Sequence, residues 1–392
     1  MSDPVVIVSA VRTPMGGMMG DFASLSASDL GAVAIKAAVE RAGLKPEQIE
    51  EVIMGNCLIA GQGQAPARQA AIKAGLPKSA AAVTLTKMCG SGMKATQLAN
   101  DEIMAGTREI VVAGGMESMT NAPHMLPKSR AGYRYGAVQM QDHMATDGLE
   151  DAYDHKAMGV HAENCVKKYE FTREAQDAFA IASTERAKAA TASGAFKWEI
   201  APVTVKGRAG EVVIDADEQP PKAKLDKIPG LKPAFVKEGT ITAANASSIS
   251  DGAAALVLMK ESKAKALGLK PIARIVGHAE HSQEPEWFTT APVGAIKNLL
   301  KKTGWDKKDV DLFEINEAFA TVTMAAMKEF DIAHDKVNIH GGACALGHPI
   351  GASGARIIVT LIGALKKTGG KKGVAALCIG GGEGIAMAIE MI

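Results

Sequence analysis

The chain has 392 residues, of which 47% are hydrophobic and 22% are charged, and its formal net charge is +1. This length predicts more than one domain, and the balance of charge argues against a polyanion-binding surface, so no nucleic-acid partner is expected. Aromatic residues make up only 4% of the chain, which leaves few side chains for stacking on bases.

The cysteines and the apolar runs indicate the cellular compartment of the protein. Five cysteines, at positions 57, 89, 165, 344 and 378, lie far apart in the sequence. Scattered cysteines in an odd number favour a reducing compartment over a disulfide framework. No CxxC or HExxH sequence occurs, so no metal site is predicted. The sequence has no apolar run of membrane-spanning length and no recognisable signal peptide, so we expect a cytoplasmic protein without a membrane partner.

The first part of the chain alternates between predicted strands and helices. Its strands are short, apolar and β-branched, and its helices begin at capping residues and end at glycine, as Ser28 and Gly43 illustrate. Strands are predicted at 5–10, 51–55, near 83 and at 110–113, and helices at 28–42, 66–74 and 93–104.

Residues 119–249 break this pattern. Prolines punctuate the segment, and its one strongly periodic stretch predicts a helix over 173–192. We expect an inserted, loop-rich domain that covers a site or makes subunit contacts. Apolar strand character returns at 251–259, where the first domain is predicted to resume.

The strand and helix pattern then recurs. Strands are predicted at 273–276, 310–315, 337–339, 374–378 and 386–390, and helices at 292–302, 318–330 and from 351. Ala34-Ile35-Lys36 followed by Gly43 has its counterpart in Ala295-Ile296-Lys297 followed by Gly304, and Gly-Ser-Gly at 90–92 corresponds to Ala-Ser-Gly at 352–354.

This repetition predicts a duplicated α/β fold, with residues 1–118 and 250–270 in one half and residues 271–392 in the other. Alternating strands and helices favour largely parallel sheets covered by helices. Related by pseudo-symmetry, the two glycine-rich turns are expected to lie next to each other.

Cys89 lies where the predicted strand near 83 gives way to a helix, within Lys87-Met-Cys-Gly-Ser-Gly. Unpaired N–H groups at a helix N-terminus favour a thiolate, and glycines allow close approach to the sulfur. The pattern predicts a nucleophile. A buried structural cysteine is the alternative.

Three further stretches carry residues suited to the same chemistry. Asn316 lies where a strand becomes a helix, His348 lies among glycines, and Cys378 ends a strand before Gly380-Gly-Gly. An imidazole can take the proton of a thiol, a second thiol can move protons at carbon, and free N–H groups can stabilise an oxyanion. Alternatively, His348 is a hydrogen-bonded core histidine, Cys378 packs in the core, and the glycines bind phosphate.

Four motifs together, Cys89-Gly-Ser-Gly, Asn316-Glu-Ala-Phe, Gly347-His-Pro-Ile-Gly and Cys378-Ile-Gly-Gly-Gly, resemble the thiolases over essentially the whole chain. The likeness is strongest to the short-chain acetyl-CoA acetyltransferases (acetoacetyl-CoA thiolases). The resemblance implies two duplicated βαβαβαββ domains in a layered α/β arrangement. It also implies that residues 119–249 bind coenzyme A and help to form a homotetramer, a dimer of dimers, through a loop near 119–144.

The resemblance further implies a reversible, ping-pong Claisen condensation of two acetyl-CoA molecules to acetoacetyl-CoA and coenzyme A, a reaction of fatty acid metabolism. Cys89 becomes acylated while His348 accepts its proton, and Cys378 removes an α-proton from the second acetyl-CoA. Two oxyanion holes are implied. One combines His348 with a water held by Asn316, and the other uses the N–H groups of Cys89 and Gly380.

The same resemblance implies a pocket for the acyl and pantetheine groups, in which Met158 and Phe288 limit acyl length. Its lining is expected to comprise Leu149, Met158, Ala234, Phe235, Ala243, Ser247, Phe288, Ala318 and Phe319. No metal or other cofactor is implied. Pro220 stands where potassium-using members carry a tyrosine, which argues against potassium activation. Pro220 and Lys227 also depart from the residues usual at the nucleotide end of coenzyme A.

Three other functions compete with this interpretation: a 3-ketoacyl-CoA thiolase of broader chain length, a ketoacyl-synthase-type condensing enzyme, and an inactive scaffold. The synthases pair their cysteine with two histidines or with a histidine and an asparagine, so Cys378 argues against that class. The presence of all four motifs argues against a scaffold.

Overall fold

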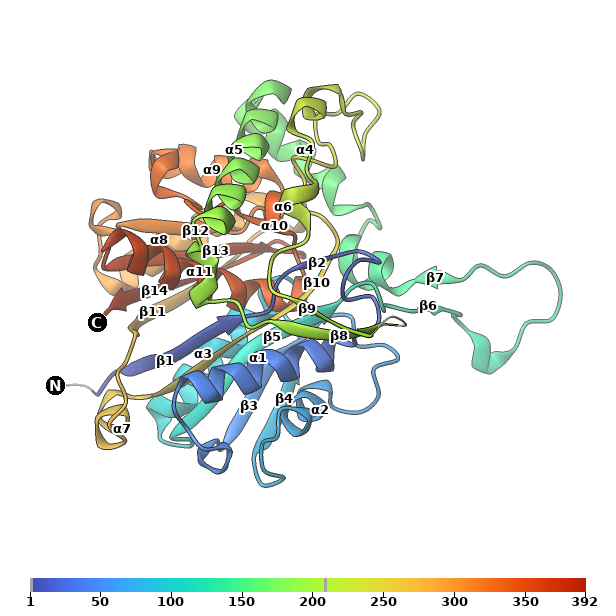
Figure 1. Cartoon of the computed structure of the whole chain (residues 1–392). Coiled ribbons are helices and arrows are strands. Elements are labelled where there is room, and N and C mark those ends of the chain that lie inside the picture. The colour runs from blue at the N-terminus through green and yellow to red at the C-terminus, as the bar shows by residue number, and fades with distance from the viewer. Residues whose placement is uncertain (1–2, 208–209) are drawn as a thin grey trace.

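The computed structural model describes residues 3–207 and 210–392 (Figure 1). Residues 1–2 of the first predicted domain and 208–209 of the predicted insertion lie outside the described residues. Figure 1 shows the first half of the chain, in blue and cyan, beside the last part, in orange and red. Within the described ranges, no helix combines the length and the apolar character needed to cross a membrane.

The first half follows the order β-α-β-α-β-α-β-β. Its elements are β1 (Val5–Arg12), α1 (Ala27–Arg41), β3 (Glu51–Gly55), α2 (Pro66–Lys73), β4 (Ala81–Leu85), α3 (Ser91–Ala105), β5 (Ile110–Ser118) and β10 (Ser250–Lys260). The strands lie in the order β1-β10-β5-β3-β4, and the two-residue strand β2 (Gly16–Gly17) pairs with β10.

The last part of the chain repeats this topology. Its elements are β11 (Ala273–Ser282), α8 (Ala291–Thr303), β12 (Leu312–Ile315), α9 (Ala320–Phe330), α11 (Ile350–Thr368), β13 (Lys372–Ile379) and β14 (Glu383–Met391). The strand order β11-β14-β13-β12 matches that of the first half, and two residue pairs between β1 and β11 join all these strands into one sheet. The predicted duplication of a layered α/β unit is therefore confirmed.

Two details of the sequence prediction are wrong. The sheet is mixed, because β10 and β14 run antiparallel to both of their neighbours within their own half, and only the pairs β3–β4, β3–β5 and β12–β13 are parallel. The strand predicted at 337–339 is reduced to a single parallel bridge between Val337 and Phe313. Asn338 has φ +47°, which ends the extended conformation, and its side-chain amide bonds the backbone of Ile315 in place of a ladder.

Both faces of the sheet are apolar, which produces a layered core. Val6 and Val8 of β1 pack in a cluster with α1 and α2, whereas Val5 and Ile7 point to the opposite face and pack in a cluster with α3 and α11. On the far side, α8 and α9 cover the second half of the sheet. Because side chains alternate along a strand, this arrangement requires strands that are apolar at every position. Helices α3 and α11 therefore lie between the two halves.

Glycine permits the close packing of α3 against α11. A Cβ atom on Gly92 would lie 2.7 Å from the backbone nitrogen of Ala355, and one on Gly354 would lie 2.4 Å from the backbone nitrogen of Met93. Neither backbone could tolerate such a contact. The prediction that the two glycine-rich turns are neighbours is confirmed.

The segment between the halves supplies one side of the site. It contains α4 (Met158–Tyr169), α5 (Arg173–Ala192), the hairpin of β8 (Val203–Gly207) and β9 (Gly210–Ile214), and α6 (Gln219–Lys222). The predicted helix over 173–192 is confirmed as α5, and α4 escaped prediction because Gly159 stands in its first turn. Short turns η3 (Ala145–Leu149) and η6 (Pro285–Thr290) complete the surroundings of the site.

A long arm leaves the body between β6 (His124–Met125) and β7 (Gln141–Asp142) (Figure 1). Two short helices, α7 (Glu261–Ala266) and α10 (Ala343–Leu346), complete the set of α-helices in the described part of the chain. Met140 and Tyr135 on the arm are exposed, with Tyr135 fully open to solvent. The arm thus presents apolar side chains away from the core.

Candidate active site

A cavity of about 480 Å³ opens between the inserted segment and the two halves. Cys89, His348 and Gly380 all contribute to its wall, together with all nine residues of the predicted acyl and pantetheine pocket: Leu149, Met158, Ala234, Phe235, Ala243, Ser247, Phe288, Ala318 and Phe319. The remaining two predicted catalytic residues, Asn316 and Cys378, are 1% and 0% exposed and lie behind this wall. Three motifs distant in the sequence therefore meet at one cavity.

Cys89 lies on the turn between β4 and α3, two residues before the helix begins. A Cβ on Gly90 would lie 2.5 Å from the Ile379 side chain, so glycine lets this turn pack against β13. Burial raises the pKa of the Cys89 thiol to about 11, against the opposing effect of the backbone N–H of Gly380. In the free protein, desolvation therefore outweighs the backbone N–H groups that favour the thiolate.

Gly380 begins the turn between β13 and β14. Gly381 and Gly382 have φ +93° and +86°, in the left-handed region that glycine adopts without strain. This turn directs the N–H of Gly380 at the Cys89 sulfur. A backbone donor in that position can stabilise negative charge on a group bound to the sulfur.

His348 is held in one orientation by the first turn of α11. Its Nδ1 lies 2.5 Å from the hydroxyl oxygen of Ser353, which itself donates to the carbonyl of Pro349 at 2.9 Å. Since that hydroxyl has a single hydrogen, it accepts from Nδ1–H of His348. Nε2 is then left with a lone pair. Burial, and secondly the charge of Arg356, lower the pKa of His348 to about 3, so the imidazole is neutral near pH 7.

Asn316 faces the same imidazole nitrogen. Its Nδ2 lies 3.5 Å from Nε2 of His348, and its Oδ1 accepts from Nη2 of Arg356 at 3.3 Å. Arg356 is held in turn by a buried ion pair with Glu314 at 3.0 Å. The guanidinium fixes the amide so that its N–H groups point toward His348, which suits either the imidazole or a water beside it.

Cys378 lies in an apolar cluster with Phe288, Ala318 and Phe319. Burial raises its pKa well above the ordinary value, and the charge of the Cys89 thiolate raises it further. The two sulfurs are thus close enough to influence each other, and ionisation of one opposes ionisation of the other.

A second cavity of about 370 Å³ shares Ala243 and Ser248 with the first. Its wall includes Lys222, Lys224 and Lys227, three lysines within six residues around α6. Amino groups at this spacing give a cationic wall suited to phosphate. The sequence analysis did not identify this cluster, although the spacing of the three lysines was visible.

Glu117 is a further buried residue that the sequence analysis did not single out. Its carboxylate accepts from the backbone N–H groups of Cys57, Leu58 and Gly351. These contacts join the loop after β3 to the start of α11, just after His348. Glu117 therefore fixes the position of the histidine-bearing turn, and the signal for it was the motif Gly114-Gly-Met-Glu at the end of β5.

Comparison with known proteins places this geometry in a family. Residues 5–262 match the thiolase N-terminal domain and residues 269–391 the thiolase C-terminal domain. An acetyl-CoA acetyltransferase of Cupriavidus necator is 54% identical over 388 residues, covering 98% of this chain and 99% of the relative.

Two solved structures share the whole fold. The crystal structure of the Bacillus anthracis acetyl-CoA acetyltransferase has a TM-score of 0.97 at 44% identity, and covers 100% of this chain and 99% of that one. A thiolase from Ascaris suum, in complex with coenzyme A, has a TM-score of 0.95 at 47% identity, and covers 99% and 100% of the two chains.

Proposed function

This chain belongs to the thiolase family, and we propose that it acts as an acetyl-CoA C-acetyltransferase, which reversibly condenses two acetyl-CoA molecules to acetoacetyl-CoA and coenzyme A. The observation that carries this assignment is the meeting of Cys89, His348 and Gly380 at one apolar cavity, with Cys378 directly behind it. Because the two thiols have different surroundings, they suit two different roles, acyl transfer at Cys89 and proton transfer at Cys378.

In the first half-reaction, the sulfur of Cys89 attacks the thioester carbonyl while its proton passes to Nε2 of His348. The thioester C–S bond breaks, and coenzyme A leaves with the proton from His348. Because the thiol and imidazole are both neutral at rest, the proton moves only as the sulfur forms its new bond. The N–H of Gly380 stabilises the oxyanion.

In the second half-reaction, Cys378 first loses its thiol proton to solvent, and the resulting thiolate takes an α-proton from a second acetyl-CoA. The enolate carbon attacks the acetyl group on Cys89, a C–C bond forms, and the C–S bond to Cys89 breaks. The proton on Cys378 then passes to the departing Cys89 sulfur, and Cys378 regains a proton from solvent, which restores both cysteines. Acetylation supports this order, because an acetylated Cys89 cannot ionise and so no longer opposes the ionisation of Cys378.

The two adjoining cavities suit the two parts of a coenzyme A thioester. The first is apolar, with Phe288 and Phe319 in its wall, and fits an acyl group and its pantetheine arm. The second has Lys222, Lys224 and Lys227, and fits the phosphates of the nucleotide end. Lys227, a departure from the usual family residue, therefore adds a charge suited to that site.

We propose a cytoplasmic homotetramer, a dimer of dimers, in which the arm between β6 and β7 carries the contact, because its exposed Met140 and Tyr135 offer apolar surface. The reaction as drawn uses side chains of the chain alone, so we propose that it needs neither cofactor nor potassium. A role in fatty acid metabolism, and the division into residues 1–118 with 250–270, 119–249 and 271–392, also stay predictions.

A turnover assay tests the function. Purified protein mixed with acetoacetyl-CoA and coenzyme A should cause catalytic loss of the 3-ketoacyl thioester absorbance and produce two equivalents of acetyl-CoA. Absence of cleavage at catalytic enzyme concentration contradicts the proposal.

A further inference from the structure

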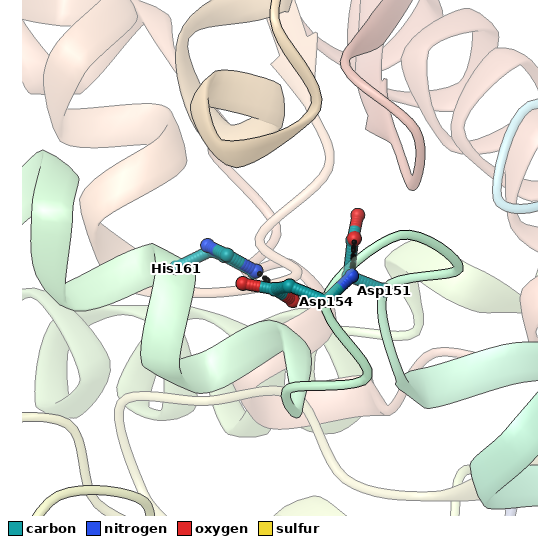
Figure 2. Close-up of side chains that lie close together, drawn as sticks. All are labelled: Asp151, Asp154 and His161. Carbon is teal, nitrogen blue, oxygen red and sulfur yellow. Dashed lines mark hydrogen bonds and ion pairs between the residues drawn. The ribbon is translucent and has the colours of Figure 1, made fainter.

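Asp151, Asp154 and His161 form a cluster of ionisable side chains that the proposed reaction does not use. One potential ligand atom from each lies within 4.8 Å of the others (Figure 2). Asp151 and Asp154 come from the loop that precedes α4, and His161 comes from the first turn of that helix. Figure 2 shows the loop folded beside the helix, with Asp154 paired to His161.

One oxygen of this cluster lacks a hydrogen-bond partner. Asp151 is 5% exposed, and its Oδ1 accepts from the N–H groups of Tyr153 and Asp154. Its Oδ2 is buried and finds no partner among the described residues. A buried carboxylate oxygen is normally satisfied, so the unpaired Oδ2 of a residue in this cluster needs an explanation.

The spacing of the other two ligand atoms suits a shared ion. Oδ1 of Asp154 lies 3.1 Å from Nε2 of His161. Two ligands bound to one ion at about 2.1 Å are roughly 3.0–3.4 Å apart when they are adjacent in the coordination sphere. The ammonium group of Lys156 binds the other oxygen of Asp154, Oδ2, at 2.8 Å, and the backbone N–H of Lys156 donates to Oδ1 at 3.1 Å. An ion would therefore replace the proton between Asp154 and His161 and leave the lysine contact in place.

The geometry points to a divalent transition-metal site formed by Asp151, Asp154 and His161. Two carboxylates and one imidazole are a mixed oxygen and nitrogen set, which suits Zn²⁺ or a similar first-row ion. Ca²⁺ and Mg²⁺ favour oxygen ligands alone, so the histidine argues against them. Asp154 is reachable from solvent, with 35% of its side chain exposed, which gives the ion an entry path.

The site would act on the wall of the substrate cavity. Glu150 and Ala157 pair through an isolated bridge at the base of the loop, and both line that cavity, as does Met158 at the start of α4. An ion held by Asp151, Asp154 and His161 would fasten the loop to the helix. The site is thus a structural clamp beside the substrate, distinct from the thiols that carry the reaction.

Calorimetric titration of the chelator-treated, full-length protein with ZnCl₂ tests this inference. We expect one Zn²⁺ per chain, and at least a tenfold loss of that affinity in His161→Gln and in Asp154→Asn, because each removes a ligand. The matched control is His155→Ala, which removes an exposed histidine from the same loop and should leave binding unchanged. Equal Zn²⁺ affinity in all four proteins, or no binding to the unaltered protein, overturns the inference.

Diffraction provides a test that does not depend on the folding of variants. Crystals of the unaltered protein grown with ZnCl₂ should give an anomalous peak at the zinc edge within bonding distance of Nε2 of His161. Peaks confined to the thiols of Cys89 and Cys378, or to exposed histidines, would overturn the assignment.

Discussion

Nδ1 of His348 donates to the hydroxyl oxygen of Ser353 across 2.5 Å, and this contact determines which nitrogen of the imidazole faces the substrate. Ser353 lies in the first turn of α11 and is fully buried. Its own hydrogen is engaged by the carbonyl of Pro349, so it can only accept from the ring. The helix that separates the two halves of the fold thus also sets the protonation of the proposed base.

Removing the Ser353 hydroxyl should lower turnover while the protein stays folded. Ser353→Ala frees the ring to adopt the other tautomer, and we expect kcat to fall on the order of tenfold to a hundredfold, below the full contribution of a general base. Ser353→Thr keeps the hydroxyl and should recover most of the loss. Thr360→Val, which deletes a buried hydroxyl two turns further along α11, is the control. A kcat unchanged in Ser353→Ala would contradict the assigned tautomer.

Enlarging Gly354 should disrupt the packing of the two central helices. A Cβ atom there would lie 2.4 Å from the backbone nitrogen of Met93, so Gly354→Ala forces α11 away from α3. We expect a loss of about 1–3 kcal/mol in the free energy of unfolding. Gly230→Ala meets open space and should change stability by less than about 0.5 kcal/mol. Denaturant titration compares them, and equal stability of the two variants would refute this account of the helix contact.

Acid should destabilise the protein through its buried histidines. Burial lowers the pKa of His348 to about 3, and that of His334 and His340 to about 4. The unfolded chain therefore binds more protons than the folded one between these values and about 6.5, so the free energy of unfolding falls as the pH drops through this window.

The histidine contribution can be measured one residue at a time. Each buried histidine adds up to about 1.4 kcal/mol per pH unit within the window. Denaturant titrations between pH 4.5 and 6.5 should show a shallower slope for His340→Asn than for the exposed control His155→Asn. Identical slopes would show that His340 titrates normally in the folded protein.

The size of the acyl pocket should depend on Phe288. This side chain is 2% exposed and lines the cavity beside Phe319, with ring centroids 6.3 Å apart. Phe288→Ala should raise kcat/KM for a six-carbon 3-ketoacyl-CoA relative to acetoacetyl-CoA by about tenfold or more, since each added methylene that fits contributes a factor of that order. Phe313→Ala opens the outer core instead and should leave the ratio unchanged. An unchanged ratio in Phe288→Ala would assign chain-length control elsewhere.

Much of the fold could be predicted because the sequence repeats its own pattern. The counterparts Gly92 and Gly354 occur in turns of similar composition, and they are the residues at which α3 and α11 touch. The mixed direction of the strands could not be predicted from alternation alone, since β13 and β14 are joined by a tight turn instead of a helix. The predicted strand at 337–339 does not form, because the Asn338 side chain, in place of a backbone ladder, bonds the backbone of Ile315.

In the site, likewise, the identities of the reactive residues could be predicted from the spacing of motifs, whereas their pKa values depend on burial in the folded chain. Cys89, His348 and Cys378 could be named from short motifs, because Cys89 and His348 lie in glycine-rich turns before a helix and Cys378 lies at the end of a strand before three glycines. The direction in which the pKa of the Cys89 thiol shifts could not be predicted from these motifs, because it depends on how much water the folded chain excludes from the sulfur. The cluster of Asp151, Asp154 and His161 matches no familiar ligand spacing, and only the folding of the loop onto α4 brings it together.

The central claim is that Cys89 carries the acyl group while Cys378 moves the proton at carbon. Brief exposure of the Cys378→Ala variant to acetyl-CoA, followed by peptide mass spectrometry, separates these roles. We predict near-stoichiometric acetylation of Cys89, because the acetyl group is transferred but cannot be consumed without the second thiol. An unmodified Cys89, or an acetyl group on a different residue, would contradict the account.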